Sequence, residues 1–205
     1  MSHLSTWYFS FGEWMYKLFI LNICWILLSL SGGFIFLGGV FPATVAIYAT
    51  FRKDFQASGD IKLFQTFFYY FKKELVKANL YGYGMTLIGS ILFLNIRIIG
   101  QLETSLLNSV LMILTYGLLI LFLLVAMYFL PVYVHFQLKP ITYVKYAFIL
   151  LIGKPLQTIA LVVCILVIFY IFYRFPVLLP FLGVSSIAYP IMKYSLTFFT
   201  TQKEA

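Results

Sequence analysis

The chain has 205 residues, of which 63% are hydrophobic and 10% are charged, and its formal net charge is +8. An average soluble domain is about 45–50% apolar and about 25% charged, and a small domain has too much surface to hide a larger apolar share. This composition excludes a soluble globular domain and a disordered chain, and the two cysteines exclude a disulfide-rich secreted scaffold. We therefore expect one integral membrane domain over residues 1–205, an all-α, polytopic membrane helix bundle of about six transmembrane helices plus two interfacial amphipathic helices.

The first uncharged stretch lies between Lys17 and Arg52 and contains 34 residues. A single helix of that length would measure about 51 Å, whereas about 20 residues suffice to cross a hydrocarbon core of about 30 Å. Residues that break helices also fall in its middle, namely Gly32, Gly33, Gly38, Gly39 and Pro42. We therefore predict a hairpin of two short helices, near residues 16–32 and 36–52, over the alternative of one span followed by a re-entrant segment that protein shields from lipid.

The second helix of this hairpin is predicted to begin in the segment Phe-Pro-Ala-Thr. Proline suits the first turn of a helix, and small residues beside it let two backbones approach closely. We expect a packing motif for the hairpin made of Gly39, Pro42, Ala43 and Thr44. A functional role for the same residues is the alternative.

Residues 60–77 are predicted to form an amphipathic helix that lies in the inner membrane interface and leads into the next span. Apolar residues recur at helical spacing and lysines occupy the margins: Leu63, Phe64, Phe67, Phe68 and Phe71, then Lys62, Lys72, Lys73 and Lys77. A second helix of this kind is predicted over residues 139–154. Its repeating residues are Tyr143, Ala147, Phe148 and Leu151.

The other uncharged stretches predict one span each, at residues 77–97, 106–131, 155–173 and 176–196, which brings the number of spans to six. Twelve of the 14 Lys and Arg residues then lie on one side of the membrane, and only Arg97 and Arg174 lie on the other. Positive charge is retained on the cytoplasmic side. We therefore expect a multi-pass protein of the bacterial cell membrane with both termini in the cytoplasm.

Ionisable residues stand near the ends of the predicted spans. An ion-coupled carrier needs such a group inside the membrane, but Glu74 and Arg97 are placed at the interfaces, where we expect them to be anchors. His3 and His135 are isolated, so we expect no metal site, and the chain has no nucleotide-binding loop or nucleophile turn. We expect no enzymatic activity, no cofactor and no nucleic acid partner. The polar residues within spans are expected to bond neighbouring helices: Asn22, Asn79 and Asn95.

Short stretches in the first part of the chain carry a family resemblance. In order, they are Glu13-Trp14-Met15, Leu21-Asn22-Ile23-Cys24-Trp25-Ile26-Leu27, Phe41-Pro42-Ala43-Thr44-Val45-Ala46, Arg52-Lys53, Phe64-Gln65-Thr66-Phe67 and Lys72-Lys73-Glu74-Leu75-Val76-Lys77-Ala78-Asn79-Leu80. The series resembles the YesL-type family of bacterial integral membrane proteins, a domain of unknown function, most closely over residues 12–90. Members of that family occur mainly in Gram-positive bacteria and are often encoded beside oligosaccharide-binding lipoproteins and sugar ABC importer permeases. The resemblance implies a role near carbohydrate uptake and supplies no catalytic residues.

Two classes of function fit this sequence. The first is a non-catalytic accessory subunit of a carbohydrate ABC importer, which contacts the lipid bilayer and the importer's permease subunits or ATPase, and oligosaccharide only indirectly. Its candidate residues for partner or lipid contact are Phe68, Lys72, Lys73, Lys77, Lys139 and Lys154. The second class is a stand-alone small-molecule carrier or channel. The inner loops lack the Glu-Ala-Ala loop of ABC permeases, so we do not expect a permease.

Overall fold

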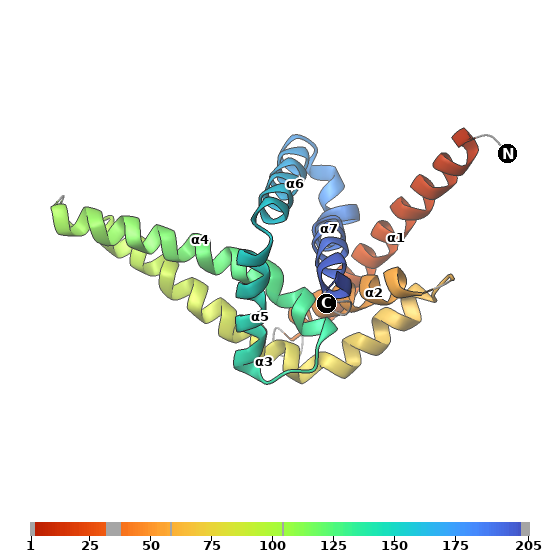
Figure 1. The fold of residues 1–205 in the computed structure, drawn as a ribbon, viewed down its shortest axis with the longest axis horizontal. Coiled ribbons are helices and arrows are strands. Elements are labelled where there is room, and N and C mark those ends of the chain that lie inside the picture. Colours follow the sequence, from red (N-terminus) through yellow and green to blue (C-terminus); the bar gives the residue numbers. More distant parts are fainter. Residues whose placement is uncertain (1–2, 32–37, 58, 104, 202–205) are drawn as a thin grey trace.

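Seven α-helices and one short 3-10 turn make up the described part of the chain (Figure 1). The computed structural model describes residues 3–31, 38–57, 59–103 and 105–201, and none of these residues forms a strand. The helices are α1 His3–Ser31, α2 Val40–Gln56, α3 Leu63–Ile99, α4 Leu106–His135, α5 Pro140–Gly153, α6 Pro155–Arg174 and α7 Leu179–Thr201, with the turn Pro176–Leu178 before α7. The predicted all-α class is confirmed.

Five of these helices, α1, α3, α4, α6 and α7, are long and apolar enough to cross a membrane. The remaining two are shorter. α2, which replaces the predicted span at residues 36–52, has 17 residues and carries Arg52, Lys53 and Asp54 near its end. Its length of about 26 Å falls short of a hydrocarbon core of about 30 Å. The structure thus supports a multi-pass helical membrane protein with five long helices and one short helix where six full spans were predicted.

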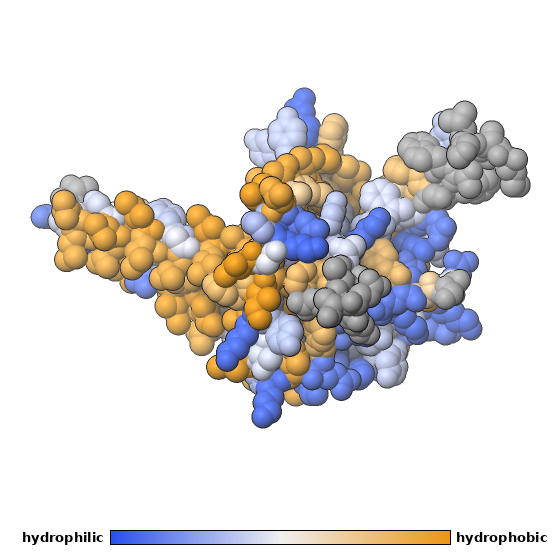
Figure 2. Space-filling view, viewed as in Figure 1, coloured by the Kyte–Doolittle hydropathy of each residue, from blue (hydrophilic) through white to orange (hydrophobic). Residues whose placement is uncertain are grey.

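The helices form three arms that diverge from a common centre around α2 (Figure 1). One arm is α1, the second is the pair α3 and α4, and the third is the pair α6 and α7. Figure 2 shows that the α3–α4 arm is hydrophobic along its length, whereas hydrophilic residues gather on the central part of the molecule near α2 and the start of α3. The surface is therefore divided into lipid-compatible arms and a basic end. We define the basic end as the last turn of α2, the first half of α3, the α4–α5 connection and Lys154.

α2 forms the centre of the core. Nine of its residues are buried, from Pro42 to Phe51 with Thr44 alone less enclosed. Three of them are alanines, Ala43, Ala46 and Ala49, and such small side chains let neighbouring helices approach closely. A central helix surrounded by protein does not need the length or uniform apolarity of a lipid-exposed span.

α1 and α2 run antiparallel, as the predicted hairpin requires. Lys17 in the middle of α1 reaches Asp54 near the end of α2. Further along α1, the Trp25 indole N–H donates to Thr44 Oγ1 at 2.9 Å near the start of α2. A Cβ at Gly39 would lie 2.4 Å from the Leu28 carbonyl oxygen, so only glycine allows this contact. The predicted breakers Gly32 and Gly33 lie outside the described residues.

α3 is continuous over 37 residues, whereas an interfacial helix followed by a separate span was predicted. No proline occurs between Leu63 and Ile99, the first glycine is Gly82, and the stretch around Lys77 consists of good helix formers. Nothing therefore ends the helix at the membrane interface. Figure 1 shows that the first half of α3 runs beside α2 and that its second half turns away to pair with α4. α5, by contrast, is separate because Pro155 follows Gly153 closely.

Candidate functional site

A polar chamber of about 750 Å³ opens at the basic end, between α2, α3, the end of α4 and α5. Three cations, one carboxylate and one histidine line it: Arg52, Lys73, Lys77, Glu74 and His135. The three cations exceed the single carboxylate by two charges, so the chamber is electropositive. An electropositive recess of this kind attracts anionic groups.

Arg52 contributes hydrogen-bond donors to the wall of the chamber. One Nη1 N–H donates to the Val134 carbonyl oxygen at the end of α4. The Nε atom is buried and has no hydrogen-bond partner among the described residues. A guanidinium is always charged and carries five donors in a rigid fork. Arg52 therefore keeps donor capacity that the described residues leave unused.

Four aromatic rings form a cluster beside the chamber, and three of them, Tyr81, Tyr133 and Tyr143, line it. Tyr81 comes from α3, Phe129 and Tyr133 from α4, and Tyr143 from α5, and all six pairs of ring centroids lie 5.2–6.1 Å apart. These spacings are those of favourable edge-to-face and offset aromatic contacts. The Tyr133 hydroxyl also donates to Glu74 Oε2 at 2.5 Å, which holds that carboxylate in place. This aromatic cluster fixes α3, α4 and α5 relative to one another.

An apolar groove of about 400 Å³ continues from the chamber between α2, α3 and α4. Val45, Tyr81 and Tyr133 line both spaces. A Cβ at Gly82 would lie 2.1 Å from the Phe41 ring, so the ring rests on bare backbone there. The groove therefore depends on small residues of α3 facing larger residues of α2 and α4.

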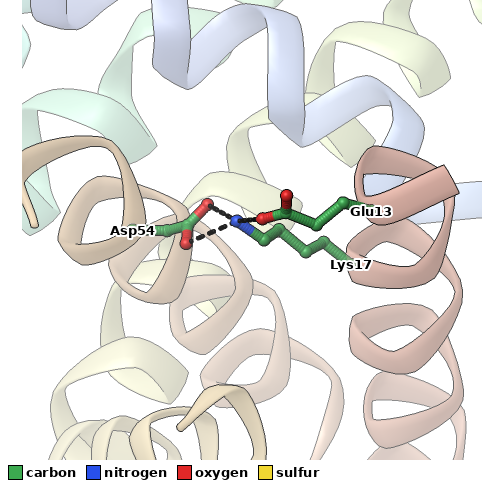
Figure 3. Close-up of polar contacts among 3 residues, drawn as sticks. All are labelled: Glu13, Lys17 and Asp54. Atoms are coloured by element: carbon green, nitrogen blue, oxygen red, sulfur yellow. Dashed lines mark hydrogen bonds and ion pairs between the residues drawn. The ribbon is translucent and has the colours of Figure 1, made fainter. Parts of the chain in front are cut away.

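An ion-pair cluster joins α1 to α2 near the basic end (Figure 3). Lys17 Nζ lies 2.8 Å from Glu13 Oε1, one turn earlier on α1, and 3.0 Å from Asp54 Oδ1 on α2. The carboxylate of Asp54 is nearly buried and Glu13 is exposed. Asp54 lies near the end of α2, whereas Glu13 and Lys17 lie toward the middle of α1, within the apolar stretch Phe11–Leu30 that is long enough to span a membrane.

Two of the three predicted polar residues bond neighbouring segments. The Asn22 side chain on α1 donates to the Pro180 carbonyl oxygen at 2.7 Å and accepts from the Val184 backbone N–H at 2.9 Å. Asn79 Nδ2 donates to the Gly38 carbonyl oxygen at 2.9 Å, just before α2. Asn95, in contrast, lies exposed on the outer half of α3.

The predicted contact residues are spread over the basic end. Lys73 and Lys77 line the chamber, whereas Lys72 faces outward and covers the exposed Phe68 ring at 4.4 Å. Lys139 is exposed immediately before α5. A further predicted residue, Lys154, stands between α5 and α6 with its Nζ 5.7 Å from the Phe198 ring. The structure thus separates this set into chamber residues and outer surface residues.

The predicted packing motif lies in the α1–α2 contact. Pro42 and Ala43 are fully buried in the first turn of α2. The Thr44 hydroxyl donates to the Val40 carbonyl oxygen at 2.8 Å and accepts from Trp25. Because Thr44 also lines the apolar groove, the motif borders the candidate site as well as packing the hairpin.

Sequence reasoning missed the residues that complete the chamber. Arg52, Tyr133 and Tyr143 belong to α2, α4 and α5 and are separated by long stretches of chain. Each was counted as a loop charge or an apolar residue of a helix. The signal available in the sequence was the position of Tyr133 and His135 at the basic end of a hydrophobic span.

Comparisons with known proteins place this chain in a family. The chain matches the model of "Protein of unknown function, DUF624" over residues 18–96. Three proteins of Bacillus subtilis (strain 168) are also similar. YteU is 31% identical over 185 residues, which cover 89% of this chain and 81% of YteU. YesV is 30% identical over 184 residues, 90% of this chain and 87% of YesV.

YesL is 30% identical over 149 residues, which cover 73% of this chain and 68% of YesL. All three relatives are described as uncharacterized proteins. No solved structure matches the chain. The extent of these alignments confirms the resemblance seen in the sequence, and the chain belongs to the DUF624 family of proteins of unknown function, together with YesL.

Proposed function

We propose that this chain is a non-catalytic accessory subunit of a carbohydrate ABC importer in the bacterial cell membrane. The observation that carries the proposal is the α3–α4 arm, whose side chains beyond the core are apolar and largely exposed: Leu87, Ile91, Leu94, Val110, Ile113 and Leu114. Thr115 is buried on this outer half of the arm. An arm of this kind offers a lateral surface to lipid and to the transmembrane helices of a partner.

The basic end supplies the second contact of this proposal. Phe68 and Lys72 form an exposed aromatic and cationic pair on the outer face of α3, and Lys139 is exposed at the start of α5. A partner's groove can accept the exposed face of such a helix. In this proposal the importer's permease contacts the α3–α4 arm, and either the permease or the ATPase contacts the basic end. Oligosaccharide contacts this chain only indirectly, through these subunits.

Antiparallel pairing supports the proposed orientation, with both termini in the cytoplasm. α2 returns the chain to the side where α1 began, as the contacts of Lys17 with Asp54 and of Trp25 with Thr44 require. α3 with α4, and α6 with α7, form two more pairs that leave and return (Figure 1). The Lys-rich segments then share one side, which the positive-inside rule assigns to the cytoplasm.

The test is affinity purification of the tagged chain from its bacterium in mild detergent, with quantitative mass spectrometry of the proteins that co-purify. We expect enrichment of an importer permease or ATPase, and loss of that partner in the Lys72→Glu variant. Lys72→Arg is the matched control. It keeps the positive charge and a side chain of similar length, so the partner should remain bound if it recognises only those two properties. If importer subunits are no more abundant than with an unrelated membrane protein, the accessory proposal is wrong.

The polar chamber favours one alternative, a stand-alone carrier of small molecules. Its aromatic rings beside polar groups suit a small polar ligand. Purified protein in liposomes distinguishes the two functions. The accessory proposal expects no saturable sugar flux from this chain alone, and saturable flux would replace it with the carrier.

A further inference from the structure

We propose that the chamber and the groove form one binding site for a single anionic phospholipid. Its phosphate-bearing headgroup occupies the polar chamber, and one of its acyl chains occupies the apolar groove. This site is independent of the importer proposal, because it uses the inner surfaces between α2, α3, α4 and α5 and not the outer faces.

The two spaces are contiguous and differ sharply in chemistry. Val45, Tyr81 and Tyr133 line both of them. Charged side chains line the chamber, whereas the groove is lined by apolar residues and by threonine hydroxyls. Those hydroxyls are already used, since Thr44 and Thr86 donate to the carbonyl oxygens of Val40 and Gly82. A ligand that fills both spaces must therefore have one charged end and one apolar end.

The chamber selects a negative headgroup. Arg52, Lys73 and Lys77 line the chamber from two helices, and the single carboxylate, Glu74, accepts a hydrogen bond from the Tyr133 hydroxyl. The buried Arg52 Nε lacks a protein acceptor among the described residues. Arginine and lysine are the residues that bind phosphate oxygens by charge-assisted hydrogen bonds, and basic pockets between membrane helices on the cytoplasmic side bind anionic headgroups.

The groove has the length of one acyl chain in one leaflet. Its α3 side runs from Ala78 to Gly89, a rise of about 16 Å along the helix. That is about half of a hydrocarbon core of about 30 Å. On α3, the smallest residues that line the groove are Ala78, Gly82 and Gly89. A Cβ at Gly89 would lie 3.3 Å from the Phe122 ring of α4. The narrow, apolar shape suits a single alkyl chain.

The first experiment compares lipids. The full chain is purified in a neutral detergent and titrated with phosphatidylglycerol or with phosphatidylcholine of identical acyl chains, and bound lipid is counted by native mass spectrometry. We expect one phosphatidylglycerol per chain and binding of phosphatidylcholine that is about tenfold weaker or more. Equal binding of the two lipids would overturn the proposal.

A competitor separates a lipid from a free phosphate as the ligand. Soluble glycerol phosphate carries the charge of the headgroup and has no acyl chain. We expect it to leave phosphatidylglycerol bound at equal concentration, because the groove contributes to the affinity of the lipid. Full displacement of the lipid would show a phosphate site without a chain site and would overturn the proposal.

Two comparisons of matched variants locate the lipid, and the first tests the headgroup chamber. Lys73→Gln with Lys77→Gln removes two chamber cations, and Lys62→Gln with Lys145→Gln removes two exposed cations outside it. We expect the chamber pair to weaken phosphatidylglycerol binding about tenfold or more and the outer pair to change it less than about twofold. Equal losses would mean attraction by net charge alone and would overturn the site.

The second comparison of matched variants tests the acyl-chain groove. Thr86 lines the groove and is exposed, so Thr86→Phe fills the space without disturbing the core. Ser90→Phe adds the same ring one turn further along α3, at an exposed position outside the groove lining. We expect a loss of about tenfold in phosphatidylglycerol affinity for Thr86→Phe and no change for Ser90→Phe. Unchanged binding in Thr86→Phe would overturn the acyl-chain site.

Discussion

Single polar residues join helices that are far apart in the sequence. Asn22 on α1 is 1% exposed and bonds backbone groups near the start of α7, including Pro180 and Val184. Lys17 joins α1 to Asp54 at the other end of the α1–α2 contact. Burial of a polar amide among apolar helices is favourable only when its bonds are made. These two residues therefore fix the register of α1 against its neighbours.

Replacement of Asn22 tests this role. Asn22→Ala should lower the free energy of unfolding by about 1–2 kcal/mol, because it leaves backbone groups of α7 without partners and because interhelical hydrogen bonds in membrane proteins are worth up to about that amount. A thermal melt in detergent should show a decrease of about 2–8 °C. Asn95→Ala removes the same group from an exposed position on α3 and should shift the melt by less than about 2 °C. Equal shifts for the two variants would contradict the bonding role of Asn22.

At the scale of the element, α3 shows how packing divides an apolar pattern. Leu63, Phe67 and Phe71 follow one another at intervals of four residues and face the core. Phe64 and Phe68 lie on the adjacent face and are 62% and 37% exposed. Both faces are apolar, but the face with Phe67 packs against other helices, whereas the face with Phe64 lies on the surface of the protein. The helix thus has two aromatic faces, one buried against the core and one exposed, and the exposed side also carries lysines.

Two aspartate variants separate these faces. Phe67 is fully buried, and Phe67→Asp should destabilise the fold by more than about 4 kcal/mol because it opens a cavity and buries a charge. Phe64→Asp, on the exposed face, should cost about 1 kcal/mol or less. The measurement is protease resistance of residues 54–77 together with the yield of monodisperse protein in detergent. Equal resistance in both variants would mean that this half of α3 is not docked on α2.

Much of the helical pattern follows from the sequence, and the division of its faces does not. Uncharged stretches predicted the long apolar helices because charge is costly in a hydrocarbon core. They could not show that α2 is a short, enclosed helix, since apolar residues facing protein and apolar residues facing lipid look alike. The predicted break near Lys77 failed for a related reason. A change in surroundings from interface to core requires no break in the hydrogen-bond ladder of α3.

The candidate site was predictable only in its basic character. Lys73 and Lys77 share a helical face, so their proximity follows from spacing along α3. Arg52, Tyr133 and Tyr143 reach the chamber from three other helices. Their convergence depends on how α2 packs among α3, α4 and α5, and no periodicity within one segment encodes that arrangement. Sequence analysis therefore found one wall of the chamber and missed the others.

At the scale of the whole molecule, the pairs α3–α4 and α6–α7 extend from the centre around α2, and α1 forms an arm of its own (Figure 1). The pair α3–α4 is held at its base by the contact of Glu74 with Tyr133 and further out by the approach of Gly89 to Phe122. The pair α6–α7 turns sharply at Pro176–Leu178. Because these two pairs are antiparallel, α4 and α7 both run back toward the central part of the molecule (Figure 1). The apolar arms thus diverge from a centre that carries the basic end (Figures 1 and 2).

Cysteine labelling tests this arrangement in the membrane. Gln101 follows α3 at the tip of its arm, and Gly59 lies between α2 and α3 at the basic end; both are exposed. In a chain with Cys24→Ala and Cys164→Ala, a maleimide that cannot cross membranes should label Gln101→Cys in intact cells and leave Gly59→Cys unlabelled. Permeabilised cells provide the control, because both positions should then react. The expectation rests on the sequence, in which the six predicted spans put 12 of the 14 Lys and Arg residues on one side, and positive charge is retained on the cytoplasmic side. Labelling of Gly59→Cys alone in intact cells would invert the orientation. Labelling of both positions or of neither in intact cells, with reaction of both after permeabilisation, would mean that the α3 segment does not cross the membrane.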